Sequence, residues 1–558
     1  MQSPVRFSSC RGVAFEIKPH SDPFAIGNET KDEPRSGSIR RLWPSWNQLN
    51  SSKVFPSSIS KSMSLASSHF CDLDPDNNND EEDDDYEDDV VLQKLEEGDH
   101  HDENSEKDHK PIIPSASKRQ QGGARKQSGS RLSVILLDQG LFTVYKRLFA
   151  VCLTLNITGL VLAATGNFPY ARNRTALFSI ANIFALTLCR SEAFLRVVFW
   201  FVVKVFGRPW VPLPIKTATT SLLQSLGGIH SSCGVSSVAW LVYALVLTLK
   251  NRANTSSEII IVASAILSLL CLSCLAAFPL VRHLHHNVFE RFHRFAGWTS
   301  LALLWVFVVL TISYDPKTKS YSNQLGSRLI KQQEFWFTLA ITVLIIIPWL
   351  TVRRVPVKIS APSGHASIIK FEGGVKSGIL GRISPSPLSE WHAFGIISDG
   401  KSEHMMLAGA VGDFTRSLVS NPPSHLWVRQ VHFAGLPYLT NMYDRVLLVA
   451  TGSGICVFLS FLLQPSRANV CVLWVAKGIE QNFGKEIEEM MNMQPKDKVI
   501  VHDTAVLGRP NVSQMSVDAA KKFGAEIVIV TSNPEGSRDV VNACKASGIA
   551  AFGPIWDS

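Results

Sequence analysis

The chain has 558 residues, more than a single domain normally holds, and a formal net charge of +8. This charge averages over separate acidic and basic blocks, so it does not indicate a nucleic-acid partner. The hydrophobic content of 46% is ordinary for a soluble protein, but the apolar residues are concentrated in the middle of the chain. We therefore expect several units of different character and no nucleic-acid binding.

Residues 1–140 are predicted to form a disordered N-terminal tail. An acidic run from Asp72 to Asp102 is followed by a basic stretch from Lys118 to Arg131. Blocks of like charge repel themselves and bury little apolar surface, so they do not fold by themselves. A solvated tail is the simplest interpretation, and a docking or phosphorylation segment is the alternative. The first nine residues lack the apolar core of a signal peptide.

Residues 141–354 are predicted to form a helical membrane domain of about six spans, since a spanning helix needs about 20 mostly apolar residues. The second span is short and continues into residues 189–206, where charged and aromatic residues are mixed. We interpret that continuation as an interfacial amphipathic segment in contact with membrane lipid. The candidate spans are Leu148–Thr165, Thr175–Leu188, about Ile229–Leu249, Ile259–Val281, Trp298–Ile312 and Phe335–Leu350.

Lysine and arginine residues cluster at one set of span ends. They precede the first span, follow the second, separate the fourth from the fifth, and follow the sixth at Arg353 and Arg354. Because positive loops stay in the cytoplasm, both chain termini are expected there, in a multi-pass protein of the plasma membrane or an endomembrane. The glycosylation sequons at Asn173 and Asn254 fall in loops on the opposite side, which agrees.

After Arg354 the pattern changes to that of a soluble module. Residues 355–440 contain short alternating segments punctuated by Gly and Pro, which predicts a small antiparallel β-barrel. Residues 441–558 alternate strand-like and helix-like segments, which predicts a doubly wound parallel α/β domain. The ligand of such a domain binds at the carboxyl ends of its strands.

The turn Thr451-Gly452-Ser453-Gly454 lies between the first predicted strand and the first predicted helix of the α/β domain. Glycines let the backbone approach a pyrophosphate, and a helix N-terminus supplies N–H donors and a positive dipole. In this context we interpret the turn as a nucleotide site. The alternative is an ordinary connecting loop that binds no ligand.

The whole arrangement resembles the ferric reductase/NADPH oxidase superfamily, in which six spans precede a ferredoxin-reductase-like barrel and α/β domain. Glu390–Ile396 is similar to the family's flavin motif and Gly412–Thr415 to its flavin-pyrophosphate segment. Tyr443–Ile455 looks like its nucleotide strand and glycine turn, and Gly508–Pro510 like its later nucleotide loop. The closing Phe552–Ser558 is similar to plant and fungal ferric-reductase-like membrane proteins.

This resemblance implies a bound FAD and a bound NADPH or NADH. Arg509 would favour the 2′-phosphate of NADPH. The implied FAD contacts are His392, Ala393, Phe394, Gly395, Ile396, Gly412, Thr415 and Trp556, and the implied NAD(P) contacts are Thr451, Gly452, Ser453, Gly454 and Arg509.

The chain departs from the family pattern at three places. Ala393 and Gly395 replace a proline and a hydroxyl residue of the flavin motif, so a hydrogen bond to the isoalloxazine is in doubt. Thr531–Pro534 replaces a Cys-Gly-Pro near the nicotinamide, and Cys456 stands where a Thr-Pro pair is usual. Hydride transfer needs close, fixed stacking of nicotinamide on flavin, so these changes threaten fast turnover more than binding.

Members of the superfamily carry two histidines on each of the third and fifth spans, which hold two haems. Here His230 begins the third span and His293 the fifth, so both would lie at the cytoplasmic face. The outer positions are near Tyr243 or Ala244 and near Val306 or Phe307, and none of them is histidine. At most one b-type haem is therefore expected. The alternative is that His230 and His293 are interfacial residues bonded to backbone or lipid headgroups.

The favoured function is a membrane flavoprotein that takes hydride from NAD(P)H through FAD to an inner haem or to an acceptor on the cytoplasmic side. The sequence does not identify that acceptor, whether small molecule or protein. The second hypothesis is a catalytically degenerate redox or nucleotide sensor that keeps the fold. A transporter or channel is least favoured, because no predicted span carries paired charges.

Overall fold

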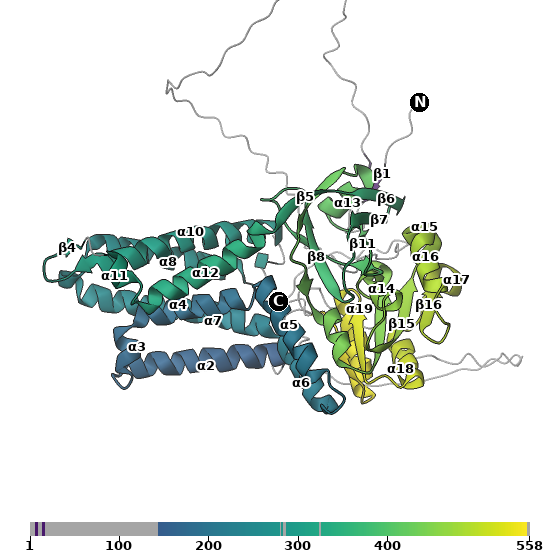
Figure 1. Ribbon diagram of the computed structural model, residues 1–558, viewed down its shortest axis with the longest axis horizontal. Coiled ribbons are helices and arrows are strands. Elements are labelled where there is room, and N and C mark those ends of the chain that lie inside the picture. Colours follow the sequence, from purple (N-terminus) through teal and green to yellow (C-terminus); the bar gives the residue numbers. More distant parts are fainter. Residues whose placement is uncertain are drawn as a thin grey trace, which may run out of the picture. The chain divides into compact units, whose positions relative to one another are not determined.

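A computed structural model describes residues 143–554, apart from 279–280, 283–285 and 323–324, together with two short strands near the N-terminus (Figure 1). These strands, β1 (Arg6–Ser8) and β2 (Ala14–Glu16), pair antiparallel and belong to a separate unit, Met1–Lys61. The rest of the predicted tail, with its acidic run, lies outside the described residues, and so does Trp556.

The apolar part of the chain forms long helices packed along one another (Figure 1). Five helices of the described part are long and apolar enough to cross a membrane. Many of their apolar side chains are exposed, among them Leu155, Ile261 and Leu275. Lipid would cover such a surface in a membrane. The five are α2 (Val144–Ala164), α7 (Leu226–Lys250), α8 (Ser257–Ala276), α10 (His286–Ser313) and α12 (Gln333–Leu350).

The predicted second span forms a shorter helix, α4 (Thr175–Leu188), preceded by the single turn α3 (Pro169–Asn173). Its 14 residues rise only about 21 Å, less than the roughly 30 Å of a hydrocarbon core. The helix packs against α7 and α12 inside the bundle. Five spanning candidates are therefore present, and the sixth span stays a prediction.

The helix ends that carry the predicted positive clusters lie together. The Tyr145 and Ser231 hydroxyls hydrogen-bond over 2.9 Å, which joins the start of α2 to the start of α7. At the opposite end Arg174, the middle residue of the first sequon, pairs with Glu334 at the start of α12 over 2.9 Å. The alternation of ends agrees with the predicted topology, whereas the side of the membrane that each end faces remains a prediction.

The predicted interfacial segment forms helix α5 (Glu192–Phe206), which with α6 (Leu213–Gln224) makes a hairpin between α4 and α7. One face of α5, including Leu195, Phe199 and Val202, packs into the hydrophobic core of the soluble module. On α6, the Thr220 hydroxyl hydrogen-bonds to the buried Tyr443 hydroxyl over 2.7 Å. The hairpin thus belongs to the module as much as to the bundle.

The first part of the module is built from two antiparallel sheets, as the alternating pattern predicts. Their strand orders are β10-β11-β7-β6 and β13-β8-β12-β5, with β9 paired to β8. The first strand begins at Val352, slightly before the predicted boundary, because Val352–Pro356 pairs with His425–Arg429. The strands are β5 (Val352–Pro356), β6 (Lys358–Ser363), β7 (Ala366–Glu372), β8 (Ile379–Ser384), β9 (His392–Gly395), β10 (Ile397–Ser398), β11 (Glu403–Gly409), β12 (His425–Arg429) and β13 (Phe433–Ala434), and helix α13 (Asp413–Ser420) precedes β12.

The second part is a parallel sheet of order β16-β15-β14-β17-β18, the order of a doubly wound domain. Helices α18 (Val512–Phe523) and α19 (Pro534–Ala546) pack on one face, and the 3-10 segment η2 (Leu436–Met442) connects the barrel to the sheet. The strands are β14 (Arg445–Thr451), β15 (Asn469–Ala476), β16 (Val499–Asp503), β17 (Ile527–Thr531) and β18 (Ala550–Phe552).

Two predicted helices of this domain differ in the structure. The segment after the glycine turn is a 3-10 stretch, η3 (Gly452–Val457), followed by the short α14 (Leu459–Leu463). The helix predicted around residues 483–492 is divided into α15 (Ile479–Phe483) and α16 (Lys485–Asn492), because Gly484 adopts a φ of 83° that no helix continues.

Candidate functional site

The glycine turn lies at the carboxyl edge of the parallel sheet, where a doubly wound domain binds its ligand. Thr451 ends β14, and Gly452 takes a φ of 52°, which glycine adopts without strain. Ser453 and Gly454 are buried, whereas Thr451 and Gly452 keep partial exposure. A nucleotide phosphate can therefore approach the turn at Thr451 and Gly452 more readily than at the next two residues.

Two further residues hold this turn in place: Trp474, which no sequence motif indicated, and Ser532, which lies in the Thr531–Pro534 segment noted above. The Trp474 indole donates a 2.9 Å hydrogen bond from Nε1 to the carbonyl of Gly452. The Thr451 hydroxyl lies 2.7 Å from the Ser532 hydroxyl on the neighbouring loop. The segment that departs from the family pattern near the nicotinamide is thus bonded directly to the glycine turn.

Asp503 organises the next part of the same edge. Its carboxylate accepts hydrogen bonds from the amides of Gly478, Ile479 and Ala505 at 2.8–2.9 Å. Burial alone would raise the pKa of Asp503, but these amide donors outweigh it and the pKa is lowered. Arg509 lies in the exposed loop after α17 (Thr504–Leu507), two strands from the glycine turn.

The predicted flavin motif and the glycine turn come together. His392–Gly395 forms β9, and a Cβ built on Gly395 would lie 2.7 Å from both the backbone N and Cα of Val457 in η3. A Cβ on Gly409 would lie 3.0 Å from the Ser453 hydroxyl. The replacement of the family's hydroxyl residue by Gly395 therefore has a packing reason, since only glycine lets β9 approach η3 this closely.

The predicted pyrophosphate segment lies beside the flavin motif. The His392 and Phe414 rings stack with centroids 4.5 Å apart and planes at 10°. The Thr415 hydroxyl accepts from the amides of Val411 and Gly412 at 3.1 and 3.0 Å, so it stabilises the start of α13. The amides of the first helical turn, from Asp413 onward, have no acceptor within the helix and suit an anion. Ala393, Phe394 and Ile396 complete the motif, with the last two fully buried.

The segment that carries the flavin motif is held on the first turns of α10. Arg294 donates to the carbonyls of Leu388 and Ser389 at 3.1 and 3.0 Å, and Arg291 pairs with Glu390 at 3.0 Å. Glu290, itself paired with Arg294, accepts from the Trp391 amide at 3.5 Å. The candidate haem ligand His293 lies within this same helical turn.

A second contact joins the module to α5. The Glu192 carboxylate pairs with Arg382 and, at 3.2 Å, with Arg429. Burial alone would raise the pKa of Glu192, but the two guanidinium groups outweigh it and the pKa is lowered. The Arg429 guanidinium lies 4.8 Å from the ring centre of Trp391, so the same cluster also contacts the flavin motif.

His230 and His293 lie at the same end of the bundle, close enough to influence each other's charge, and Arg190 is near both. The His230 Nδ1 atom is 3.0 Å from the Leu186 carbonyl. A metal-bound histidine commonly donates its second ring N–H to such a carbonyl, which leaves Nε2 available. The His293 Nδ1 atom is buried and has no hydrogen-bond partner within the part of the chain that the structure describes. Both interpretations of the two rings, as ligands of one haem and as interfacial histidines, stay predictions.

The other half of the bundle contains a cluster whose buried members are aliphatic side chains. The cluster joins α4, α7, α8, α10 and α12. Tyr243, Ala244, Val306 and Phe307 lie at this depth, and Phe307 packs against the cluster. No imidazole is present there among the described residues. The buried members of the cluster are Ile180, Leu241, Ile266, Leu304, Val308 and Ile341.

Comparison with known proteins identifies relatives of this chain. The model of the C-terminal domain of adenylate-forming reductase 03009 matches residues 436–558. Adenylate-forming reductase 03009 of Coprinopsis cinerea is 34% identical over 428 residues, covering 76% of this chain and 41% of that protein. Adenylate-forming reductase 06235 of the same fungus is 34% identical over 432 residues, with the same coverage. The chain therefore spans about two-fifths of the length of these relatives.

The match with these relatives is about twice as long as the soluble module, so it extends into the helical region. Among solved structures, phthalate dioxygenase reductase is 12% identical, with a TM-score of 0.29 over 36% of this chain and 68% of its own. The relatives support a reductase-like module. Membership of the ferric reductase/NADPH oxidase superfamily stays a prediction.

Gly395→Ala tests the contact between β9 and η3. The added methyl would lie 2.7 Å from Val457 backbone atoms, so we expect a loss of about 1–3 kcal/mol in the free energy of unfolding. Thermal unfolding of the full chain in detergent measures the effect. Gly364→Ala, where a Cβ meets nothing within 4 Å, is the matched control. Equal stability of the two variants would contradict the packing argument.

Glu192→Gln tests the joint between α5 and the module. It leaves two arginines facing each other without a carboxylate, so we expect a loss of about 3 kcal/mol at pH 7. Because the pKa of Glu192 is lowered in the folded state, its contribution is complete above the ordinary glutamate value of about 4.3. That contribution is lost as pH falls through the lower folded value.

Thermal unfolding at several pH values checks this expectation. The difference between wild type and Glu192→Gln should be the same at pH 7 and pH 6, and should shrink only below about pH 4. The control is Glu489→Gln on the exposed face of α16, which should change stability little. If the Glu192→Gln variant were as stable as that control, the Glu192 cluster would not stabilise the contact between α5 and the module.

Proposed function

We propose that the chain is a membrane flavoprotein that oxidises NAD(P)H and delivers electrons to an acceptor on the side of the membrane that carries the soluble module. The observation that supports it most directly is the contact between the flavin motif and α10. Arg291, Arg294 and Glu290 hold residues 388–391 against the helical turn that contains His293. An electron leaving the motif therefore meets a candidate haem ligand first.

In this proposal the two parts of the module have separate roles. Gly452 and Thr451 would receive the pyrophosphate of NADPH or NADH, with Arg509 further along the edge for a 2′-phosphate. The β9 backbone and the His392–Phe414 stack would position FAD, and the first turn of α13 would bind its pyrophosphate. A bound FAD would accept two electrons as a hydride from NAD(P)H and would supply them one at a time to an acceptor. The close packing of β9 on η3 excludes water from this junction.

The names of the relatives support the reductase part of this proposal. This chain spans only about two-fifths of them, and the adenylate-forming part of their name is not carried over. The membrane location is supported by the five long apolar helices and by their exposed apolar side chains. The acceptor is a single haem between His230 and His293, or a small molecule or protein at the same end of the bundle.

One observation favours the alternative of a redox or nucleotide sensor. Ser453 and Gly454 are buried against the barrel, and Cys456 lies behind them, fully buried, with its pKa raised by burial to about 12. A turn packed in this way can bind a nucleotide slowly without supporting rapid hydride transfer. The two functions differ in whether NAD(P)H bleaches the flavin within seconds.

Purified full-length protein should show a flavin absorbance spectrum that NADPH bleaches. Gly452→Ala should lower the bleaching rate at least tenfold while the flavin is retained, because a methyl group there obstructs the pyrophosphate. Gly524→Ala is the matched control, since Gly524 also has a positive φ, 66°, but lies where α18 ends, beside Arg445 at the opposite edge of the sheet. Protein that retains FAD but is not bleached by NADPH or NADH would favour the sensor, and protein that binds neither flavin nor nucleotide would contradict both functions.

The haem content is expected to be zero or one per chain. A pyridine haemochrome measurement on full-length protein in detergent counts it, and ferricyanide reduction on sealed vesicles of known orientation tests transfer across the bilayer. If one haem is found, His293→Ala should remove it, whereas His365→Ala on the exposed barrel surface should not. Two haems per chain, or rapid reduction of ferricyanide on the far side, would show that the aliphatic half of the bundle conducts electrons after all.

A further inference from the structure

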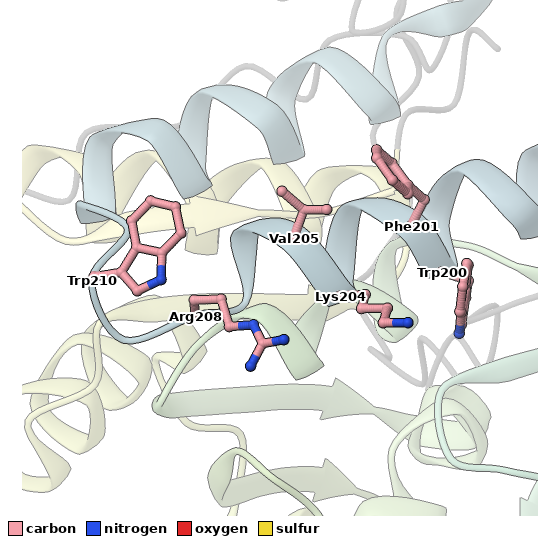
Figure 2. Close-up of a pocket in the computed structure, with 6 residues that line it drawn as sticks. All are labelled: Trp200, Phe201, Lys204, Val205, Arg208 and Trp210. Carbon is pink, nitrogen blue, oxygen red and sulfur yellow. The ribbon is translucent and has the colours of Figure 1, made fainter.

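The outward surface of the α5–α6 hairpin combines cations with exposed aromatic rings. Trp200 and Lys204 lie one turn apart on α5, and Arg208 follows two residues beyond the end of that helix (Figure 2). Trp200 is 50% exposed, and Trp210, beyond the end of α5, is 75% exposed. With Phe201 and Val205 these residues line an open hollow of about 510 Å³.

The cations of this hollow are available to a ligand. The Lys204 Nζ atom lies 4.9 Å from the Trp200 ring centre, and neither Lys204 nor Arg208 forms an ion pair with an acidic side chain in the described part of the chain. The only acidic residue of the hairpin is Glu192, which Arg382 and Arg429 already neutralise. The surface therefore favours an anion.

Chain connectivity indicates what that anion belongs to. Three residues separate α4 from α5, and a single residue separates α6 from α7, so the hairpin is fixed at the end of the helix bundle. Its outward side also exposes Val197 by 61% and Phe201 by 56%. Exposed tryptophans beside cations at the end of a spanning helix are typical of the membrane–water interface, where rings lie at headgroup depth.

We propose that this hollow binds the headgroup of an anionic phospholipid. Lys204 and Arg208 contact the phosphate, and Trp200, Phe201 and Trp210 lie against the glycerol backbone and the first part of the acyl chains. The opposite face of α5 packs into the core of the soluble module through Phe199 and Val202. A lipid at this position therefore fixes the helix that carries the module.

This inference rests on the proposed membrane location but not on the proposed flavin chemistry. The test is native mass spectrometry of the full-length protein purified in detergent and titrated with phosphatidylglycerol or phosphatidylcholine. We expect the wild type to retain phosphatidylglycerol in preference. Lys204→Gln combined with Arg208→Gln should weaken that retention by about fivefold for each charge removed. Lys204→Arg should preserve it.

The controls separate this site from general charge effects. Lys376→Gln combined with Lys401→Gln removes two exposed lysines of the barrel and should leave lipid retention unchanged. Trp210→Ala should lower the retention of both lipids, because its ring would lie against the glycerol backbone and acyl chains that both lipids share. Inorganic phosphate at the same concentration should not displace phosphatidylglycerol. Thermal unfolding of every variant verifies that it is folded.

Three results would overturn the proposal. Equal retention of phosphatidylglycerol and phosphatidylcholine by the wild type, or an unchanged preference in the double charge variant, would show that the hollow does not recognise the anionic headgroup. Displacement of the lipid by inorganic phosphate would show a site for a free anion. None of these results depends on flavin bleaching, so failure of the redox proposal would be recognised separately.

Discussion

The Glu192 carboxylate, placed between Arg382 and Arg429, is the interaction on which the joint between helices and module depends. It lies at the first residue of α5, whereas the two arginines come from β8 and β12 of one barrel sheet. A buried carboxylate with two guanidinium partners is held in one geometry, because moving it leaves charges without compensation. Arg429 in turn contacts the Trp391 ring. The position of the flavin motif therefore follows from a charge cluster outside it.

In the proposed function, this arrangement would let the barrel deliver electrons to the helix bundle. Two anchors act on the same segment: the Glu192 cluster through Trp391, and α10 through Leu388, Ser389 and Glu390. The rate of electron transfer falls steeply with distance. A fixed separation between donor and acceptor therefore matters more than tight binding of either one. Near α5, the His404 and His432 rings lie with their centroids 5.8 Å apart. Burial lowers the pKa of His432 to about 4. The backbone carbonyl of His432 accepts a 2.8 Å hydrogen bond from Arg196 of α5.

The sequence was sufficient where a local pattern decides the structure. Hydrophobic length located four of the five long helices within five residues, but α10 begins at His286 and not at the predicted Trp298. Alternation located the strands of the barrel and of the parallel sheet. It was insufficient where tertiary packing decides. Nothing local indicated that α5 would pack into the module through Phe199, or that Trp474 and Ser532 would hold the glycine turn. The turn was expected to open a helix, but contact with β9 leaves it as a 3-10 segment.

Some buried polar groups of the bundle are hydrogen-bonded to one another, and others have no partner among the described residues. Near its middle, the Asn156 side-chain oxygen accepts from Asn182 and from Trp240 at 2.9 and 3.0 Å, so three helices satisfy one another. Towards the module, the His293 Nδ1 atom and the hydroxyls of Ser232 and Ser236 are buried without a hydrogen-bond partner among the described residues.

Unsatisfied buried polar atoms are costly, and a folded protein normally keeps them only where a ligand or water completes them. In this bundle they lie in the half that carries His230 and His293, whereas the other half is closed by the aliphatic cluster around Leu241 and Leu304. The unsatisfied polar atoms and the apolar cluster therefore occupy different halves of the bundle. In the proposed function, a group that accepts electrons from the module would bind within the first half, because no imidazole lies in the second half among the described residues.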